Sequence, residues 1–362
     1  MKIGLVRRGY SATGGAEAYL KRFADAACEA GHSCVLFADG EWREWKGERF
    51  KLAGGSPREF ADAFAAENPH ERCDFLFSLE RVWKCDAYRA GDGVHAAWLA
   101  RRALFEPLWS PFFRRFSAKH RALLEIERAL FSPRGARVVI ANSEWIKREI
   151  AQHFRFPPER IHVVYNGVPA FTAPPNARAE VRRELGLADD DYVLLFAGSG
   201  WERKGLRFAI DAVNAATKSR PTLLVAGRGM QGAMPHSERV RFLGPVSEMS
   251  RVFAAADAFV LPTLYEPFSN ACLEALAAGL PVLTTEHNGF AEIIERGVEG
   301  EVLADPRDTA SLASSIDAWS DAARREEVRP RLLEKAARFS IEDNVRSTLA
   351  IIEDSRNSAR TA

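Results

Sequence analysis

Short apolar runs alternate with longer amphipathic segments from the start of the chain. The run KIGLV at 2–6 has the length of a buried strand, and residues 16–32 place apolar side chains at the three- and four-residue spacing of a helix. The run CVLFAD at 34–39 predicts a second strand, and DFLFSL at 74–79 and RVVIAN at 137–142 continue the series. Strand, helix and strand in succession indicate a parallel sheet whose strands are buried on both faces.

The second half of the chain repeats this pattern. Apolar runs that predict strands begin near residues 192, 222, 240, 258, 281 and 300, and a helix is expected from about Leu206. Between the halves, residues 166–180 are rich in proline and have few periodic apolar positions, which is typical of a linker. We therefore predict an α/β protein with two doubly wound, Rossmann-like domains, residues 1–168 and 176–341, that face each other across a cleft. A C-terminal helix at about 342–362 is expected to pack back on the first domain.

Composition and charge narrow the class of protein. The 362 residues are 47% hydrophobic and 27% charged, and the net charge is only +1, so no overall field attracts nucleic acid. The five cysteines are scattered and form no CxxC pair, which argues against a disulfide framework and a zinc site. The first ten residues lack the apolar run of a signal peptide, and no run approaches the ~18 residues of a membrane span. These features predict a cytoplasmic location.

A basic pair follows the first strand of the second domain. In LLFAGSGWERKGLRFAIDAV, residues 194–213, a glycine turn leads to Arg203 and Lys204 just before the helix expected from Leu206. Cations are disfavoured at a helix N-terminus, where the dipole is positive and backbone N–H groups are free. An anionic ligand therefore accounts for the pair better than a solvated basic surface does. Arginine binds a diphosphate bidentately, and lysine adds a point charge.

Two glutamates flank a second junction, in LPTLYEPFSNACLEALAAGLPV at residues 261–282. Glu266 lies in the loop before a predicted helix, and Glu274 lies about two turns inside it, on a different face. The backbone amides of 268–270 are expected to be orphan donors that face the cleft. Two carboxylates for separate hydroxyl groups, with amides for an anion between them, fit a nucleotide sugar. Taken alone the spacing is a weak signal, which surface acids show more often.

Four stretches together resemble the retaining family 4 glycosyltransferases of the GT-B fold. EPFSNACLE is similar to the E-x7-E element of that family, FAGSGWERKGL to its Arg-Lys phosphate site, RIHVVYNGV to its signature before the linker, and residues 1–37 to its opening strand, Gly-Gly loop and helix. The match covers nearly the whole chain in the right order and is most similar to the lipopolysaccharide-core glucosyltransferases. It implies transfer of a hexose from a nucleotide sugar, such as UDP-glucose, to a lipopolysaccharide-core or other lipid-linked glycan.

The resemblance also implies roles for the matched residues. Arg203 and Lys204 would hold the diphosphate, Glu274 would bind the ribose hydroxyls, and Glu266 would face the donor sugar. The implied donor-binding residues are Gly14, Gly15, Gly198, Ser199, Arg203, Lys204, Gly244, Val246, Glu266, Phe268, Ser269, Asn270 and Glu274. No metal or other cofactor is expected, because the cations and a helix end take up the charge of the diphosphate. A further arginine that the glucosyltransferases carry after the linker has no alignable counterpart here.

Catalytic residues are expected in AYRAGDGVHAAW, residues 87–98, as well as at Lys204 and Glu266. The resemblance places Asp92 at the catalytic centre, with His95 as the alternative. Either would orient the acceptor hydroxyl or the donor sugar. On spacing alone, Asp92 is at least as well explained as a turn residue between two glycines, and His95 as a satisfied histidine at a helix start.

The segment 98–121 interleaves aromatic and basic side chains, with Glu106 as its only acid. This composition suits an anionic membrane surface, where each basic residue contributes about 1 kcal/mol. Because a lipid-linked acceptor would require such docking, we expect the protein to lie peripherally on the inner face of the plasma membrane. The alternatives are a core helix with a solvated basic face and a groove for an acceptor phosphate. No RNA- or DNA-binding motif accompanies the segment, so nucleic acid is not an expected partner.

Two motifs imitate other sites. GRGMQG at 227–232 matches GxGxxG, but the strand expected from Val240 leaves no room for the helix of a dinucleotide site, which argues against a dehydrogenase. The aspartates of ADDDYV are interpreted as turn acids, not as a metal site. The remaining alternatives are a transferase for UDP-N-acetylglucosamine or GDP-mannose in exopolysaccharide or glycolipid synthesis and, more distantly, a non-catalytic protein that binds sugar nucleotides.

Overall fold

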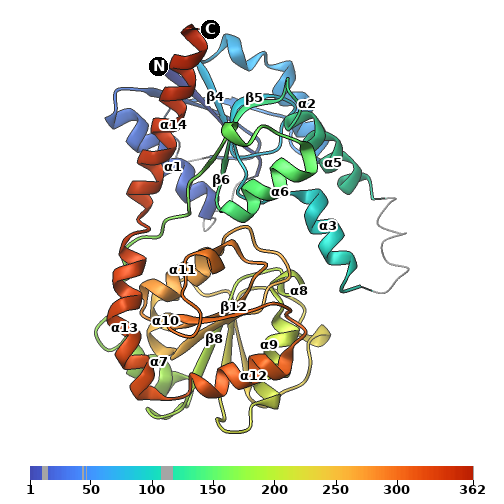
Figure 1. The fold of residues 1–362 in the computed structure, drawn as a ribbon. Helices are drawn as coiled ribbons and strands as arrows, with labels where there is room; N and C mark the ends of the chain where they lie inside the picture. The colour runs from blue at the N-terminus through green and yellow to red at the C-terminus, as the bar shows by residue number, and fades with distance from the viewer. Residues whose placement is uncertain (10–14, 43–44, 46, 107–116, 362) are drawn as a thin grey trace. The chain divides into compact units, whose positions relative to one another are not determined.

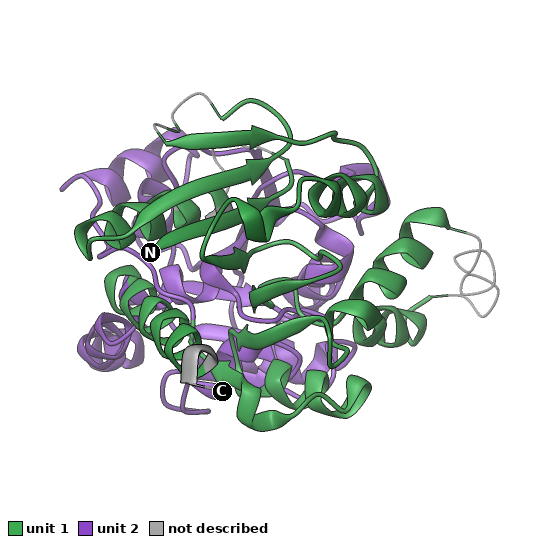
Figure 2. Ribbon diagram, turned by 90° about the horizontal axis from the view of Figure 1, so that it is seen from above, with its two compact units in different colours: residues 1–165, 341–362 green, residues 166–340 purple. Residues whose placement is uncertain are grey.

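The chain divides into two units in the computed structural model, which describes residues 1–9, 15–42, 45, 47–106 and 117–361. Unit 1 comprises Met1–Tyr165 and Ile341–Ala362, and unit 2 comprises Asn166–Ser340. Figure 1 shows each unit as a sheet with helices packed against it, and Figure 2 marks the C-terminal segment as part of unit 1. The prediction of a linker at 166–180 is partly wrong, because this stretch belongs to unit 2 and its last four residues begin a helix.

Seven parallel strands in the order β3-β2-β1-β4-β5-β6-β7 form the sheet of unit 1. The strands are β1 (Lys2–Arg7), β2 (Ser33–Ala38), β3 (Glu48–Lys51), β4 (Phe75–Ser78), β5 (Cys85–Arg89), β6 (Ala136–Ala141) and β7 (Ile161–Val163). The described α-helices are α1 (Gly15–Glu29), α2 (Pro57–Ala66), α3 (His95–Ala103), α5 (Ala118–Leu130), α6 (Glu144–Phe154) and α14 (Ile341–Thr361). Because β1 lies between β2 and β4, the chain builds one side of the sheet and then the other, as in a doubly wound fold.

The C-terminal helix α14 completes the core of unit 1. Val345 and Ile352 are buried in the same apolar cluster as Phe23 of α1. The Tyr19 hydroxyl donates a hydrogen bond to the Thr348 hydroxyl at 3.2 Å, which ties the two helices together at their polar edge. Figure 1 shows α14 running beside α1. Unit 1 is therefore built from both ends of the described chain.

Six parallel strands in the order β10-β9-β8-β11-β12-β13 form the sheet of unit 2. The strands are β8 (Val193–Ala197), β9 (Thr222–Ala226), β10 (Val240–Gly244), β11 (Ala258–Leu261), β12 (Val282–Thr285) and β13 (Gly300–Leu303). The α-helices are α7 (Ala177–Glu184), α8 (Trp201–Lys204), α9 (Leu206–Ala215), α10 (Met249–Ala255), α11 (Asn270–Ala277), α12 (Thr309–Ala318) and α13 (Ala322–Ala337). The six predicted strands and the helix from Leu206 are confirmed.

Both units are doubly wound α/β sheets, as the sequence predicted. In unit 2 the strand β8 has β9 on one side and β11 on the other, so the strand order reverses there. A short 3-10 helix, Gln231–Ala233, follows β9, so the helix that a dinucleotide site needs after GRGMQG is absent from this described stretch. Among the described helices, none combines the length and the apolar character needed to cross a membrane.

Candidate active site

Two loops meet where the strand order of unit 2 reverses. β8 leads through a glycine turn into α8, and the neighbouring strand β11 leads into the loop that carries Glu266. The carbonyl oxygen of Arg203 accepts hydrogen bonds from the Leu264 N–H at 2.8 Å and from the Thr263 hydroxyl at 2.9 Å. Ligands of doubly wound sheets bind at the carboxyl ends of the strands beside such a reversal. The fold thus brings the predicted cations and the first predicted glutamate to this position.

Glu266 joins the two predicted cations. Its Oε2 atom accepts hydrogen bonds from Arg203 Nη1 at 2.9 Å and from Lys204 Nζ at 2.8 Å. The Glu266 side chain is only 12% exposed. Burial alone would raise the pKa of this carboxyl, but the charges of Lys204 and Arg203 outweigh burial and hold the pKa below the ordinary value for glutamate. Two cations around one carboxylate leave a net positive charge, which suits an anionic ligand.

Glu274 lies on α11, and its half-buried side chain is within electrostatic reach of Lys204. Burial raises the pKa of Glu274 to about 7, although the charge of Lys204 opposes the rise. Within the part of the chain that the structure describes, this carboxylate makes no hydrogen bond or ion pair. It is therefore available to accept hydrogen bonds from hydroxyl groups of a ligand.

The turn that carries Arg203 and Lys204 needs glycine at two positions. Gly198 has φ of +133°, and a Cβ atom there would lie 2.8 Å from Lys204 Cε. Gly205 has φ of +76°, and a Cβ atom there would lie 1.9 Å from the carbonyl oxygen of Pro262. Positive φ and the absence of Cβ both favour glycine, so these positions hold α8 close to the loop that follows β11.

The backbone amides ahead of α11 are not all free, which corrects the prediction of three orphan donors at 268–270. The Ser269 N–H donates a hydrogen bond to Asn288 Oδ1 at 3.2 Å. The Ser269 hydroxyl caps the helix by accepting from the Cys272 N–H at 3.2 Å. Asn288 is buried, and its amide group also donates to the Thr284 hydroxyl at 3.0 Å. Sequence reasoning missed Asn288, because the dipeptide Asn-Gly indicates only a turn.

The other predicted donor-binding residues of unit 2 lie at or just after the ends of its strands. The Ser199 hydroxyl accepts a hydrogen bond from the Arg228 N–H at 3.2 Å. Gly244 ends β10 with φ of +68°, and Val246 follows in the next loop, half-buried. Phe268 is buried before α11. Asn270, the first residue of that helix, accepts a hydrogen bond from Asn166 Nδ2 at 2.7 Å through its side-chain oxygen. The roles of these residues stay predictions.

In unit 1 the predicted catalytic residues follow β5. Asp92 lies in a turn between two glycines, and its side chain is 74% exposed and 3.7 Å from Arg81 Nη1. His95 is the first residue of α3. Gly15 begins α1, whereas Gly14 lies outside the described residues. Asp92 is therefore the turn residue that its neighbours indicated, and its exposure leaves the carboxylate accessible to a ligand.

His95 is paired with a second histidine. Its Nε2 atom lies 3.1 Å from Nδ1 of His120 on α5, and the two rings are stacked with their centroids 5.2 Å apart. Burial, together with the charges of Arg81, His120 and Lys119, lowers the pKa of His95 to about 3. His95 is therefore neutral at physiological pH. It can orient a hydroxyl group through a hydrogen bond, but it does not supply a positive charge.

Sequence reasoning missed a charged cluster at the reversal point of unit 1. Arg7 ends β1, and Glu80 and Arg81 follow the adjacent strand β4. The Arg7 guanidinium donates to Glu80 and also to Glu17 in the first turn of α1, at 3.3 Å. Burial raises the pKa of Glu80 to about 7 despite the nearby cations. Charged residues placed directly after buried strands were the available signal, because the carboxyl ends of parallel strands share one edge of a sheet.

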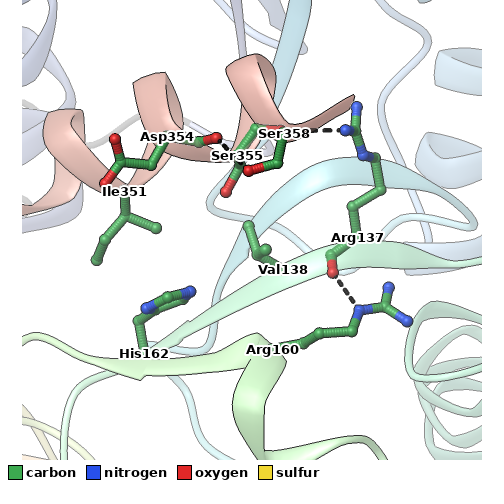
Figure 3. A pocket seen from close by; sticks show the side chains of 8 residues that line it. All are labelled: Arg137, Val138, Arg160, His162, Ile351, Asp354, Ser355 and Ser358. Carbon is green, nitrogen blue, oxygen red and sulfur yellow. Dashed lines mark hydrogen bonds between the residues drawn. The ribbon is translucent and has the colours of Figure 1, made fainter. Parts of the chain in front are cut away.

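A cavity in unit 1 lies away from these residues. Its volume is about 480 Å³, and it opens between α14 and the strands β6 and β7. Figure 3 shows Arg137 reaching α14, where it donates to the Ser355 carbonyl at 3.2 Å, while Arg160 donates to the Arg137 carbonyl. Arg137 lies at the amino end of β6, the opposite edge of the sheet from Asp92. Since both guanidinium groups bind backbone oxygens, they serve to hold the helix and strands together.

The aromatic and basic segment 98–121 is described only at its two ends. Residues 107–116, which include Trp109, lie outside the described residues. In the described part, the guanidinium of Arg101 lies over the ring of Phe105, and Arg102 forms an ion pair with Glu106 at 2.5 Å. Membrane docking by this segment stays a prediction. The described residues contain no group of three or more His, Cys, Asp or Glu side chains placed to bind a metal ion.

Two family models match the chain. The model described as Glycosyltransferase Family 4 matches residues 13–170, and the model described as Glycosyl transferases group 1 matches residues 191–321. The first match falls mainly in unit 1 and the second in unit 2. Together they span the predicted catalytic and donor-binding residues.

Curated relatives carry the same kind of description. An uncharacterized glycosyltransferase of Methanocaldococcus jannaschii is 32% identical over 196 residues, which are 49% of this chain and 50% of the relative. A D-inositol 3-phosphate glycosyltransferase of Nocardioides sp. is 30% identical over 264 residues, 63% and 56% of the two chains. The lipopolysaccharide glucosyltransferase WaaG of Escherichia coli is 26% identical over 254 residues, 66% and 65% of the two chains. The matched stretches thus span between half and two thirds of these relatives.

Solved structures share the fold of this chain. The crystal structure of WaaG, a glycosyltransferase involved in lipopolysaccharide biosynthesis, superposes with a TM-score of 0.81 at 21% identity and covers 97% of this chain and 99% of its own. The structure of Anabaena Alr3699/HepE in complex with UDP-glucose has a TM-score of 0.71 at 18% identity, with both chains fully covered. At this identity the likeness establishes the fold.

Proposed function

This chain belongs to the family 4 glycosyltransferases of the GT-B fold, and from that premise we propose that it transfers a hexose from a nucleotide sugar to a lipid-linked glycan with retention of the anomeric configuration. UDP-glucose is the first candidate donor, and the lipopolysaccharide core is the first candidate acceptor. The observation that carries the proposal is the Arg203–Glu266–Lys204 cluster beside Glu274, at the reversal point of unit 2.

The donor would bind to unit 2 through complementary charges. Arg203 and Lys204 would hold the diphosphate, since both already bind one carboxylate oxygen and together carry an excess of positive charge. Glu274, whose carboxylate has no partner within the described chain, would accept hydrogen bonds from the ribose hydroxyls. Glu266 would face the sugar, with the residues around Ser269 beside it. The complex of HepE with UDP-glucose supports a nucleotide sugar as the ligand of this fold.

The chemical step would depend on stabilisation of the leaving group. As the bond between the anomeric carbon and the diphosphate breaks, negative charge accumulates on the departing oxygen. Lys204 and Arg203 stabilise that charge more in the transition state than in the ground state. The acceptor hydroxyl would attack from the face that the diphosphate leaves, and a diphosphate oxygen would take its proton. Asp92 and the neutral imidazole of His95 would orient the sugar or the acceptor from unit 1.

The acceptor assignment rests on the relatives and on the segment 98–121. The E. coli relative is named a lipopolysaccharide glucosyltransferase. The segment interleaves aromatic and basic residues, a composition that suits an anionic membrane surface. We therefore propose that unit 1 binds the acceptor and that the enzyme works at the inner face of the membrane. This proposal needs neither a bound metal nor nucleic acid.

A second candidate acceptor is a small phosphorylated cyclitol. Its support is the 30% identity to D-inositol 3-phosphate glycosyltransferases over 264 residues of one relative and 233 of another. Under this alternative the donor would be UDP-N-acetylglucosamine or another nucleotide sugar, GDP-mannose included. The donor site in unit 2 would be the same, because its cations would hold the diphosphate, which all these nucleotide sugars share. The two candidates therefore differ in their acceptor and not in the cation cluster.

A product assay would decide between these acceptors. Purified protein is incubated with radiolabelled UDP-glucose, UDP-N-acetylglucosamine or GDP-mannose, and with truncated lipopolysaccharide or inositol 3-phosphate. We expect labelled lipopolysaccharide from UDP-glucose. Label in inositol phosphate would favour the second acceptor. Binding of a nucleotide sugar without any transfer or hydrolysis would point to a non-catalytic sugar-nucleotide protein and would refute the proposed function.

A further inference from the structure

The N-terminus of α3 has no local cap. Its N-cap residue is Val94, whose side chain cannot accept a hydrogen bond. The first backbone N–H groups of a helix lack partners inside the helix and need an acceptor from elsewhere. In this protein the helix begins at His95, so the same turn that needs an acceptor carries one of the predicted catalytic side chains.

Glu127 of α5 supplies that acceptor. Its Oε1 atom accepts from the His95 N–H at 2.8 Å, and its Oε2 atom accepts from the Ala96 N–H at 3.1 Å. The Glu127 side chain is fully buried, with 0% exposure. Burial of a carboxylate is destabilising unless an opposite charge lies beside it. Arg81 forms this ion pair with Glu127 through its Nε atom at 3.1 Å. The positive end of the α3 dipole adds to the stabilisation of this carboxylate.

Arg81 extends the same network to the turn that carries Asp92. Its Nη2 atom donates to the Gly93 carbonyl at 2.7 Å, and its Nη1 atom lies 3.7 Å from Asp92 Oδ2. The Arg81 side chain is only 10% exposed, and burial at both ends of the pair restricts its geometry. One arginine therefore contacts the backbone of the turn, the carboxylate of Asp92 and the buried cap of α3.

α5 also holds the side chain of His95. His120 and Glu127 lie seven residues apart on α5, so they share one face of that helix. His120 contacts the His95 imidazole at 3.1 Å, while Glu127 binds the His95 backbone. Both the main chain and the ring of His95 are thus fixed by the same neighbouring helix.

We propose that Arg81 and Glu127 are positioning residues for glycosyl transfer, which hold Asp92 and His95 in the geometry that orients the reacting hydroxyl or sugar. The inference rests on the proposed function, since it gives Arg81 and Glu127 their role through Asp92 and His95. Misplacement of an orienting group by about 1 Å can cost on the order of 10²-fold in rate. Neither residue belongs to the proposed donor site, which lies in unit 2.

The test compares Glu127→Gln and the neutral double variant Arg81→Met/Glu127→Gln with the wild type. Removing one partner leaves an uncompensated buried charge, so the single change can unfold the protein, whereas the double variant removes both charges and keeps the fold testable. Glu299→Gln is the matched control. Glu299 is an equally buried carboxylate, paired with Arg331 and Lys335, and it precedes β13, at the edge of the sheet of unit 2 opposite the cation cluster.

We expect the double variant to lose roughly 10- to 100-fold in kcat with its donor KM changed less than about twofold, because positioning acts on the chemical step and not on donor binding. The Glu299→Gln control should keep its kcat. In an Asp92→Ala/His95→Ala background, adding the double change should cost less than about twofold, because both groups that it positions are already absent. Equal losses with and without Asp92 and His95, or an unchanged kcat in the folded double variant, would overturn the proposal.

Hydrogen exchange tests the contact without any turnover. Loss of amide protection at His95 or Ala96 in the double variant is the expected result, because the carboxamide at position 127 keeps only one acceptor oxygen for the two N–H groups. Other amides of α3 and α5 should be protected as in the wild type. Unchanged protection would overturn the network even if the enzyme is active. If the wild type turns over no nucleotide sugar, the proposed function fails, and exchange alone then decides whether Arg81 and Glu127 hold this segment.

Discussion

The side chain of Lys204 passes directly over Gly198, so that a Cβ atom at position 198 would lie 2.8 Å from Lys204 Cε and 3.3 Å from Nζ. Gly198 also has φ of +133°, a backbone conformation that other residues rarely adopt. The glycine at the end of β8 therefore makes room for the cation that binds Glu266. Sequence resemblance named both residues, but it did not indicate that one depends on the other.

Gly198→Ala is expected to displace Lys204 and lower kcat/KM at least about tenfold, because the lysine must move away from the site of the diphosphate. The melting temperature should also fall, since strained backbone costs about 1–3 kcal/mol. Gly200→Ala is the control, because Gly200 also has positive φ, at +73°, but open space around its Cβ position. Equal losses of activity in the two variants would show that backbone strain, and not contact with Lys204, is responsible.

Lys204→Ala is expected to lower turnover roughly 10²-fold or more, the scale of losing one group that stabilises charge in the transition state. Steady-state kinetics with saturating donor would measure the loss. Lys335→Ala provides a comparison, because this lysine also pairs with a buried glutamate but lies on α13. Turnover close to that of the wild type in Lys204→Ala would contradict the assignment of the diphosphate site.

The stability of the protein should depend on Glu274 above pH 4.5. The pKa of this carboxyl is about 7 in the folded protein and ordinarily about 4.5, so the folded state binds the proton more tightly and loses stability as pH rises between those values. Glu274→Gln removes this loss. Between pH 4.5 and pH 8, we expect the free energy of unfolding of the variant to rise on the order of 1–3 kcal/mol relative to that of the wild type. Parallel urea titrations at the two pH values would reveal no such gain if Glu274 ionises normally.

Donor affinity should rise with pH through the same group. Hydroxyl groups of a bound ribose would donate to the ionised carboxylate of Glu274, so binding favours the deprotonated form. UDP-glucose should therefore bind more tightly at pH 8 than at pH 6. Calorimetry with Glu274→Gln should give weaker binding that no longer depends on pH in this range. If the variant kept the pH dependence of binding, a group other than Glu274 would be responsible for that dependence.

His95 should remain neutral down to about pH 4. Its pKa is lowered to about 3, below the ordinary 6.5, so the stability that it contributes is present above pH 6.5 and is lost as pH falls toward 3. Between pH 7 and pH 4, the free energy of unfolding of His95→Asn should fall on the order of 1–3 kcal/mol less than that of the wild type. The ring proton shifts of His95 should be flat between pH 8 and pH 5, and a titration near pH 6.5 would contradict the assigned burial.

The pattern of apolar runs was sufficient for the sheet of unit 2, because β8, β9, β11 and β12 are buried along almost their whole length and clear turns separate the strands. It failed for β3, β5 and β7 in unit 1. Charged residues in ERFK and CDAYR obscure the first two, and β7 has only three residues. Pairing with β2 and with β4 and β6 stabilises these strands, and a local pattern does not contain such partners.

The residues of the candidate site also fall into those that the sequence could identify and those that it could not. Arg203, Lys204 and Glu266 could be identified because a short motif carries each of them. Glu127 and Asn288 could not, because their partners lie 31 or 32 and 19 residues away and each fixes a loop in another part of its unit. Residues that position a site through contacts with distant parts of the sequence can be identified only from the folded structure.

Because α14 completes the core of unit 1, this unit cannot finish folding on the ribosome before α14 has been synthesised. Residues 166–340 can complete their own sheet while synthesis continues, but the apolar cluster around Phe23 stays uncovered until Val345 and Ile352 have emerged. The half of the enzyme that is made first is therefore finished last. During that interval the uncovered apolar surface of unit 1 can bind a chaperone.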